Sequence, residues 1–431
     1  MVYWPIVFVA LVLAPSAVQA AGGPDPVVPV LLVLGVVLAA AKLAGHAAEV
    51  LGQPALLGEL LAGILLGIAG RGSFPVLEQV AHSPEMHLLA SLGVLLLLFE
   101  VGLESTVPQM LSVGWPALRI AVVGVAAPTV LGVLVATVMM PDASWYTRAF
   151  VGAALCATSV GITARVLKDL DRAGSPEARL ILGAAVLDDV LGLVILAVVA
   201  GAIAAAASGQ ALAWSALSWI ALKAFLFLGG SLWAGVKVAP FLFGAAARLR
   251  SQGALLATGL VLCFLLSWLS ARFGLAPIVG AFAAGLILED IHYRDFTDRG
   301  EHGLTHLVHP LVGFLAPVFF VQMGMLTDIG RLLDVRVAIL GLGLTVAGIL
   351  GKVVSGYAAP RGLGAVDRLA VGLGMVPRGE VGLIFANIGL GLSIDGKAIV
   401  EPQTYSAIVM MVILTTLFAP AALKWRFEGR R

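Results

Sequence analysis

The sequence predicts an all-α polytopic membrane protein with about thirteen transmembrane helices. Charged residues make up 12% of the chain and hydrophobic residues 60%, whereas a soluble domain carries about a quarter charged residues. Apolar runs of about twenty residues recur, which is the length that a helix needs to cross a bilayer, and a β-barrel would show shorter alternating segments. Two adjacent aspartates, Asp188 and Asp189, lie inside one of these runs, where a carboxylate is costly to insert.

The first 22 residues are predicted to be a signal peptide. Their apolar stretch ends in small residues that suit cleavage. A retained extra helix is the alternative, because no Lys or Arg precedes the apolar stretch. The thirteen predicted spans that follow are 27–46, 54–70, 87–106, 117–140, 146–168, 177–207, 213–242, 252–273, 276–289, 306–328, 333–357, 366–393 and 402–424.

Positive charges between the spans predict the orientation. One set of loops and the tail carry thirteen Lys and Arg residues and the other set carries five, and the richer side is normally cytoplasmic. The C-terminus is therefore predicted to be cytoplasmic and the mature N-terminus outside, in the inner (plasma) membrane. The thirteen are Lys168, Arg172, Arg179, Arg248, Arg250, Arg294, Arg299, Arg361, Arg368, Lys424, Arg426, Arg430 and Arg431; the five are Arg71, Arg272, Arg331, Arg336 and Lys397.

The two halves of the chain repeat with a constant spacing. Residues 58–66 match residues 280–288 at their Gly and Ala-Gly positions, 222 positions later, and the same spacing separates Gly102 from Gly324. The span count sends the two copies in opposite directions. The pattern therefore predicts an inverted-topology repeat, as in many secondary transporters, with coincidence in a Gly/Ala/Leu-rich sequence as the alternative.

Each half contains a segment that predicts a broken helix near the middle of the membrane. Residues 157–163 collect Thr, Ser and Gly inside an apolar span, and residues 375–382 contain Pro, Arg, Gly and Glu. Pro removes a backbone donor and Gly permits unwinding, so freed carbonyl groups can coordinate a cation. A simple kink with small residues for helix packing is the alternative for each segment.

Seven ionisable side chains are predicted to lie within the membrane: Glu59, Glu100, Asp188, Asp189, Lys352, Arg378 and Glu380. Buried charges must be paired or neutralised, so Lys352 is the predicted partner of one aspartate. The alternative is a lysine that extends to the cytoplasmic surface. Neighbouring positions on a helix point about 100° apart, so one aspartate can face a water-filled cavity while the other faces a neighbouring helix.

An aspartate in this setting can exchange a cation for a proton. Burial and a second carboxylate nearby both favour the protonated form of a carboxyl group, and a carboxylate that holds a proton cannot also hold a metal cation. The aspartates, some carbonyl groups and an alternation of access suffice for obligatory exchange. The rival classes are a passive channel, an ion sensor and a solute carrier of the bile-acid type; none of them requires the aspartate pair, the broken helices and Lys352 together.

Six ionisable residues, of which Glu59 and Glu100 belong to the seven above, have no predicted role in exchange: Glu59, Glu100, Glu104, His302, His306 and His309. The carboxylates are predicted to be interfacial or structural. The histidines precede a span, where a helix start is the simpler interpretation and a pH-sensing role is the other.

Several classes of protein are excluded. The two cysteines, Cys156 and Cys263, lie in apolar segments and predict buried thiols rather than a disulfide. No nucleotide-binding loop or soluble regulatory domain is recognisable in the sequence, which excludes a pump driven by its own ATPase domain. The chain is predicted not to be an enzyme, to need no cofactor and to bind no nucleic acid.

Six stretches carry a family resemblance: 52–63 (GQPALLGELLAG), 157–167 (ATSVGITARVL), 181–192 (ILGAAVLDDVLG), 274–282 (GLAPIVGAF), 349–353 (ILGKV) and 374–383 (GMVPRGEVGL). Together they resemble the monovalent cation:proton antiporter-2 family, most closely its NapA-type sodium/proton antiporters. The likeness covers essentially the whole chain after the signal segment.

The resemblance implies an antiporter fold similar to NhaA and NapA, with two broken helices that cross and a core domain that moves like an elevator against a dimer domain. It implies a homodimer in the lipid bilayer. The implied limits are 1–22 for the signal peptide, 27–106 and 252–328 for the dimer domain, 117–207 and 333–424 for the core domain, 213–242 for a linker helix and 425–431 for a cytoplasmic tail.

The resemblance also implies the roles of individual residues. Asp189 would be the principal carrier of the ion and the proton, Asp188 would pair with Lys352, and Na⁺ would bind at Asp189 and Thr158. The implied ion-binding and proton-binding residues are Asp189, Asp188, Thr158 and Ser159, and the implied charge-pairing residues of the core are Lys352, Glu380 and Arg378. Arg378 and Glu380 are expected to form a structural ion pair or to compensate helix ends.

The predicted function is secondary active Na⁺/H⁺ antiport. An aspartate pair with a lysine resembles the electrogenic class of these antiporters. The alternative is K⁺/H⁺ antiport of the potassium-efflux type, whose members usually carry a soluble nucleotide-binding tail. Carboxylate and carbonyl oxygens suit Na⁺, Li⁺ and K⁺ alike, so the sequence leaves the choice of cation open.

Overall fold

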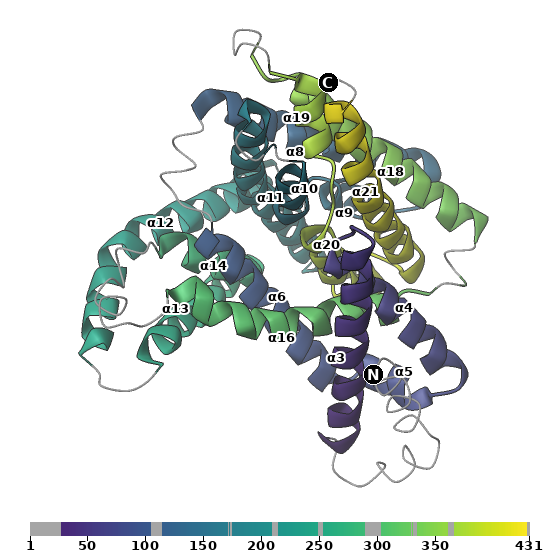
Figure 1. Ribbon diagram of the computed structural model, residues 1–431, viewed down its shortest axis with the longest axis horizontal. Helices are drawn as coiled ribbons and strands as arrows, with labels where there is room; N and C mark the ends of the chain where they lie inside the picture. Colours follow the sequence, from purple (N-terminus) through teal and green to yellow (C-terminus); the bar gives the residue numbers. More distant parts are fainter. Residues whose placement is uncertain are drawn as a thin grey trace. The chain divides into compact units, whose positions relative to one another are not determined.

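The computed structural model describes residues 27–104, 114–170, 172, 175–208, 214–248, 253–288, 303–328, 330, 334–360 and 366–428. The predicted signal peptide, 1–22, lies outside these residues. The described chain is almost entirely helical, which confirms the predicted all-α fold class (Figure 1). It forms two compact units: unit 1 contains the chain up to Leu97 with residues 310–331, and unit 2 contains residues 98–309 and 332–431.

Unit 1 is built on antiparallel helices joined by short turns. Its elements are α3 (Val27–Val50), α4 (Ala55–Gly72), α5 (Pro75–Ala81), the first part of α6 (Pro84–Glu104) and the last part of α16 (Leu304–Met325). An apolar cluster from these helices forms its core. Arg71, in the last turn of α4, donates hydrogen bonds to the carbonyl oxygens of Met325 (3.3 Å) and Thr327 (3.0 Å) and so satisfies the end of α16.

Unit 2 holds the aspartate pair and both predicted breaks. Its helices are α8 (Gly114–Met139), α9 (Trp145–Ala154), α10 (Val160–Asp169), α11 (Pro176–Ala207), α12 (Trp214–Ala247), α13 (Ala254–Arg272), α14 (Pro277–Ile287), α18 (Val335–Gly356), α19 (Arg368–Gly374), α20 (Glu380–Leu390) and α21 (Pro402–Glu428). Helix α18 packs against α8, α19 and α21, and α11 packs against α8 and α9 (Figure 1).

A short hairpin joins α20 to α21. Its strands are β1 (Ser393–Ile394) and β2 (Lys397–Ala398). The two turn residues, Asp395 (φ 50°) and Gly396 (φ 76°), adopt positive φ, which is the backbone twist that tight hairpins require.

Among the described residues, nine helices are long and apolar enough to cross a membrane, or ten if the bent helix α12 is counted as one span. Each of the thirteen predicted ranges overlaps a described helix or a pair of short helices. The multi-pass architecture is therefore confirmed, while the count of thirteen stays a prediction.

Both predicted broken helices are interrupted where the sequence indicated. The first interruption lies between Ala154 and Val160, and the second lies between Gly374 and Glu380. The helices resume 220 positions apart, which agrees to within two residues with the spacing of 222 that relates the other helices. The breaks also end earlier than the predicted segments, because helix α10 already contains Thr163 and α20 already contains Gly382.

Close glycine contacts in each unit reveal the repeat. In unit 1 a Cβ on Gly63 would lie 2.9 Å from the Cα of Gly324, and in unit 2 a Cβ on Gly102 would lie 3.0 Å from the Cα of Gly285. Adding 222 to Gly63 gives Gly285, and adding it to Gly102 gives Gly324. The two contacts are therefore copies in which the halves exchange roles, as expected for halves related by a two-fold axis.

The same spacing relates contacts between neighbouring helices of each half. A Cβ on Gly58 would lie 2.1 Å from the carbonyl oxygen of Ala44, and a Cβ on Gly280 would lie 2.1 Å from that of Leu266. Adding 222 to Ala44 gives Leu266, and adding it to Gly58 gives Gly280. The agreement of two independent contacts supports the predicted repeat over coincidence.

We expect Gly63→Ala to destabilise the protein by about 1–3 kcal/mol, because its Cβ would lie 2.1 Å from the carbonyl oxygen of Val321. Gly35→Ala is the matched control, since nothing lies within 4 Å of a Cβ at that position. Thermal unfolding of the two variants in detergent checks this. Equal melting temperatures would show that the close helix contact is dispensable.

Candidate ion-binding site

Helix α11 carries the aspartate pair into the interior of unit 2. The helix begins with Pro176 at its first position, after Ser175, whose side chain accepts a hydrogen bond from the backbone N–H of Ala178. Asp188 and Asp189 follow in the middle of this 32-residue helix. Asp188 is fully buried and Asp189 is 6% exposed, so neither lies on the surface of the unit.

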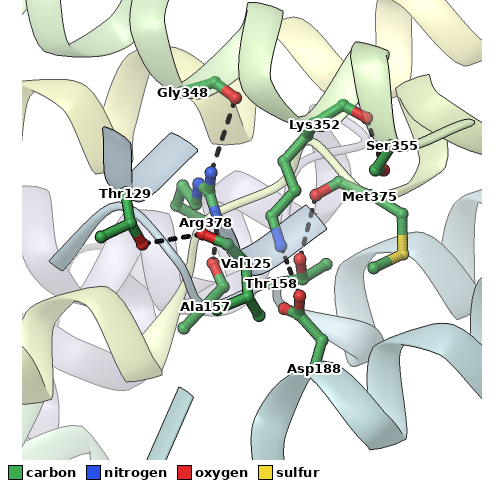
Figure 2. Close-up of polar contacts among 10 residues, drawn as sticks. All are labelled: Val125, Thr129, Ala157, Thr158, Asp188, Gly348, Lys352, Ser355, Met375 and Arg378. Carbon is green, nitrogen blue, oxygen red and sulfur yellow. Dashed lines mark hydrogen bonds and ion pairs between the residues drawn. The ribbon is translucent and has the colours of Figure 1, made fainter. Parts of the chain in front are cut away.

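A buried ion pair joins α11 to α18. The Nζ atom of Lys352 donates a hydrogen bond of 2.6 Å to Oδ1 of Asp188, and both side chains are completely buried (Figure 2). Lys352 therefore does not extend to the surface. Gly124 on α8 packs against the pair, since a Cβ there would lie 3.5 Å from both of the bonded atoms, at ordinary contact distance.

The two breaks cross and bond to each other. Thr158 donates its hydroxyl hydrogen to the carbonyl oxygen of Met375 at 3.1 Å, and the backbone N–H of Ser159 donates to that of Pro377 at 2.9 Å (Figure 2 shows the first bond). Gly379 makes the approach possible, since a Cβ there would lie 2.7 Å from Oγ of Ser159. Each break thus satisfies part of the backbone that the other leaves unbonded.

Arg378 lies in the second break and is completely buried. Its guanidinium donates hydrogen bonds to the carbonyl oxygen of Ala157 and, at 3.5 Å, to that of Gly348, while its own carbonyl accepts a hydrogen bond from Thr416 (Figure 2 shows the guanidinium bonds). The side chain of Glu380 lies outside what the structure describes, so its predicted pairing with Arg378 stays a prediction.

Cys156 links the breaks to the aspartates. It lies in the first break, within electrostatic range of four buried charges, which are Asp188, Asp189, Lys352 and Arg378. A Cβ on Gly192, one turn after Asp188 on α11, would lie 3.4 Å from the Cys156 sulfur. Two carboxylates and two cationic side chains are therefore buried around the point where the helices are interrupted.

The chemistry of these groups suits a small cation. Carboxylate, hydroxyl and backbone carbonyl oxygens are the ligands that hard cations prefer. Oδ2 of Asp188 has no hydrogen-bond partner among the described residues. The site therefore combines oxygen donors with carboxylates that can also take up protons.

Sequence reasoning identified the charged members of this site but missed Gly124, Gly192 and Cys156 as its neighbours. Gly192 ends one of the family motifs and Cys156 directly precedes another, yet nothing in their identity shows which helices they contact. Glu59 does not belong to this site. It lies buried in unit 1, within electrostatic range of Lys42 on α3.

Comparison with known proteins identifies the family. Residues 9–429 match the family described as "Sodium/hydrogen exchanger, transmembrane". The chain belongs to this family. It is also 36% identical to the high-affinity Na⁺/H⁺ antiporter NhaS3 of Synechocystis, over 93% of this chain and 90% of that protein.

Other sodium/hydrogen exchanger relatives match over similar lengths. The chain is 32% identical to the Na⁺/H⁺-K⁺ antiporter GerN of Bacillus cereus, over 92% of this chain and 96% of GerN. The structure of the sodium proton antiporter MjNhaP1 from Methanocaldococcus jannaschii matches with a TM-score of 0.66 at 16% identity, over 93% of this chain and 98% of that one. The last match shows the fold alone.

These findings confirm the predicted family and the predicted fold class. The chain is a multi-pass membrane protein of a cation/proton antiporter family, which is a family of transporters and not of enzymes.

Proposed function

We propose that this chain is a secondary active Na⁺/H⁺ antiporter in which Na⁺ and H⁺ compete for Asp189. The observation that supports this assignment is the fully buried ion pair between Asp188 and Lys352. Because Lys352 engages the first aspartate, the exchange of ions is assigned to the second. Asp189 lies within electrostatic range of Cys156 in the first break, and Thr158 and Ser159 of the same break would supply further oxygen atoms.

Competition at one carboxylate is sufficient for coupled exchange. Protonation removes the negative charge that binds the cation, and cation binding excludes the proton. The ion-binding site must change its access with either Na⁺ or H⁺ bound. Neither ion is therefore transported unless the other is transported in the opposite direction. The buried cations Lys352 and Arg378 then serve to hold the site together and to balance its charge.

Alternating access is assigned to an elevator movement of the core domain, with limits 117–207 and 333–424, against a dimer domain of 27–106 and 252–328. Helix α12 would link the two, and the protein would act as a homodimer with its C-terminus in the cytoplasm. The crossed, mutually bonded breaks favour this model, because they tie the two halves of the core into one body that carries the ion.

Potassium is the second candidate cation. The name of the relative GerN includes K⁺ as well as Na⁺, and the oxygen ligands of the site suit both ions. The exchange would work in the same way, with K⁺ in place of Na⁺ competing with H⁺ at Asp189.

Currents on solid-supported membranes test the cation and the coupling together. Proteoliposomes of the full-length chain are exposed to Na⁺, Li⁺ or K⁺ across a range of pH. We expect Na⁺ to give saturable currents whose half-saturating concentration rises as the pH falls, because protons compete for the same carboxylate. A response to K⁺ alone would show that K⁺, not Na⁺, is the substrate. Currents that need no gradient of the counter-ion would point to a channel.

A further inference from the structure

A second pair of ionisable groups lies away from the aspartates, at the end of α6. Nδ1 of His309 lies 2.8 Å from Oε1 of Glu100. The Glu100 side chain is only 9% exposed, whereas the His309 side chain is 75% exposed. The pair therefore joins a buried carboxylate to an exposed imidazole ring near the start of α16.

The inverted repeat shows that this pair is peculiar to one half of the chain. The positions that correspond to Glu100 and His309 in the other half are Gln322 and His87. Gln322 is also buried, but its amide donates a hydrogen bond of 2.8 Å to the carbonyl oxygen of Ala81. No hydrogen bond joins Gln322 to His87 among the described residues. The buried position on the helix is thus an ionisable carboxyl group, Glu100, in one half and a neutral amide, Gln322, in the other.

The helix that carries Glu100 is held tightly on both sides of it. A Cβ on Gly285 would lie 2.2 Å from the carbonyl oxygen of Phe99 and 2.8 Å from the carbonyl carbon of Gly102. There is little room for α6 to shift at this crossing. A change of charge on Glu100 is therefore expected to act on its contact with α16 rather than to bring α6 closer to α14.

Other ionisable groups lie near the pair. Glu104, one turn later on α6, lies within electrostatic range of both Glu100 and His309. On α16 the other histidine near the pair is His306, which is exposed. The described part of α14 has no ionisable side chain, and α13, on which Leu304 packs, contributes Cys263 and Arg272.

We propose that His309 and Glu100 form a regulatory proton-binding site, separate from the ion-binding aspartates. When His309 is protonated, its positive charge neutralises Glu100 through a charge-assisted hydrogen bond. When it loses the proton, Glu100 stays buried with a negative charge that faces a neutral ring, and Glu104 adds a second negative charge. The bond between α6 and α16 therefore weakens as the pH rises through the range in which histidines titrate, about pH 5 to 8.

The consequence is a pH dependence of transport that sodium cannot remove. At saturating Na⁺ the cation displaces the proton from Asp189 on the side where Na⁺ is added, so the pH on that side no longer acts through competition. A proton on His309 does not compete with Na⁺, so its effect on the rate persists at saturation. This inference rests on the proposed exchange for its transport readout, but the hydrogen bond itself can be observed without transport.

The test compares His309→Gln with the repeat counterpart His87→Gln, each in the full-length chain in proteoliposomes. At saturating Na⁺, we expect the wild-type rate to change with a single midpoint between about pH 5 and 8. His309→Gln and Glu100→Gln should remove this change or shift its midpoint by at least about one pH unit, and His87→Gln should retain it. The inference is overturned by a saturated rate that does not depend on pH, or by equal profiles for the two histidine variants.

Hydrogen exchange provides the readout that does not need transport. Amide exchange in residues 98–104 and 303–309 should accelerate with a midpoint in the same pH range, beyond the intrinsic effect of pH on exchange. His309→Gln should abolish this step and His87→Gln should not. If transport of Na⁺ fails in the wild type but the step is present, the exchange proposal is lost and the proton site stands. If transport is normal and the step is absent, the proton site is lost and the exchange proposal stands.

Discussion

Asp189→Asn is expected to abolish cation/proton exchange. Asn has nearly the same shape as Asp, but it can neither release a proton nor provide a negative charge for a cation. If Asp189 is the group for which Na⁺ and H⁺ compete, its loss removes both legs of the cycle at once. Dissipation of an imposed pH gradient by Na⁺ in proteoliposomes should fall to the level of empty liposomes.

The fold should survive this substitution. Asp189 is 6% exposed and is not the aspartate that Lys352 engages, so a neutral isostere removes a buried charge without breaking that ion pair. Asp395→Asn is the matched control, because Asp395 lies exposed in the hairpin and Asn tolerates its positive φ of 50°. Full exchange by Asp189→Asn, with a normal melting temperature, would remove Asp189 from the mechanism.

The sequence predicted the charged members of the site because charge inside an apolar run is a local signal. Asp188, Asp189, Lys352 and Arg378 each stand out against their own neighbours, and a buried charge implies a partner. The breaks were predictable for a similar reason, since Pro, Gly and hydroxyl residues interrupt helices wherever they occur in clusters. None of these inferences required knowledge of which helices touch.

Contacts between distant segments were beyond such local signals. Arg378 was expected to pair with a carboxylate or to compensate a helix end, and no local signal indicated the carbonyl oxygen of Ala157 as a partner, 221 positions away in the chain. Likewise, the sequence grouped His309 with its neighbouring histidines, whereas its partner Glu100 is 209 positions away. These contacts depend on how the helices of the two halves pack together. The spacing of 222 predicts which positions correspond, and at the breaks it does so only to within two residues.

Lys352→Ala is expected to cause the largest loss of stability in the chain. The substitution leaves Asp188 completely buried with no cation at Oδ1, where it now accepts a hydrogen bond of 2.6 Å. Removing one partner of a buried ion pair typically costs about 3–5 kcal/mol, because the remaining charge is neither solvated nor compensated. The melting temperature in detergent should fall clearly below that of the wild type, and Lys397→Ala, on the exposed strand β2, should leave it unchanged.

A double substitution separates the ion pair from the bulk of the lysine side chain. Lys352→Met keeps most of the apolar stem, so its cost is mainly the unpaired charge of Asp188. Adding Asp188→Asn removes that charge, and the double variant should be more stable than Lys352→Met alone, a sign of direct coupling between the two positions. If the second substitution gave no recovery, or if Lys352→Ala melted like the wild type, Asp188 would not depend on Lys352. The argument that assigns ion exchange to Asp189 would then lose its basis, since it relies on Lys352 engaging the other aspartate.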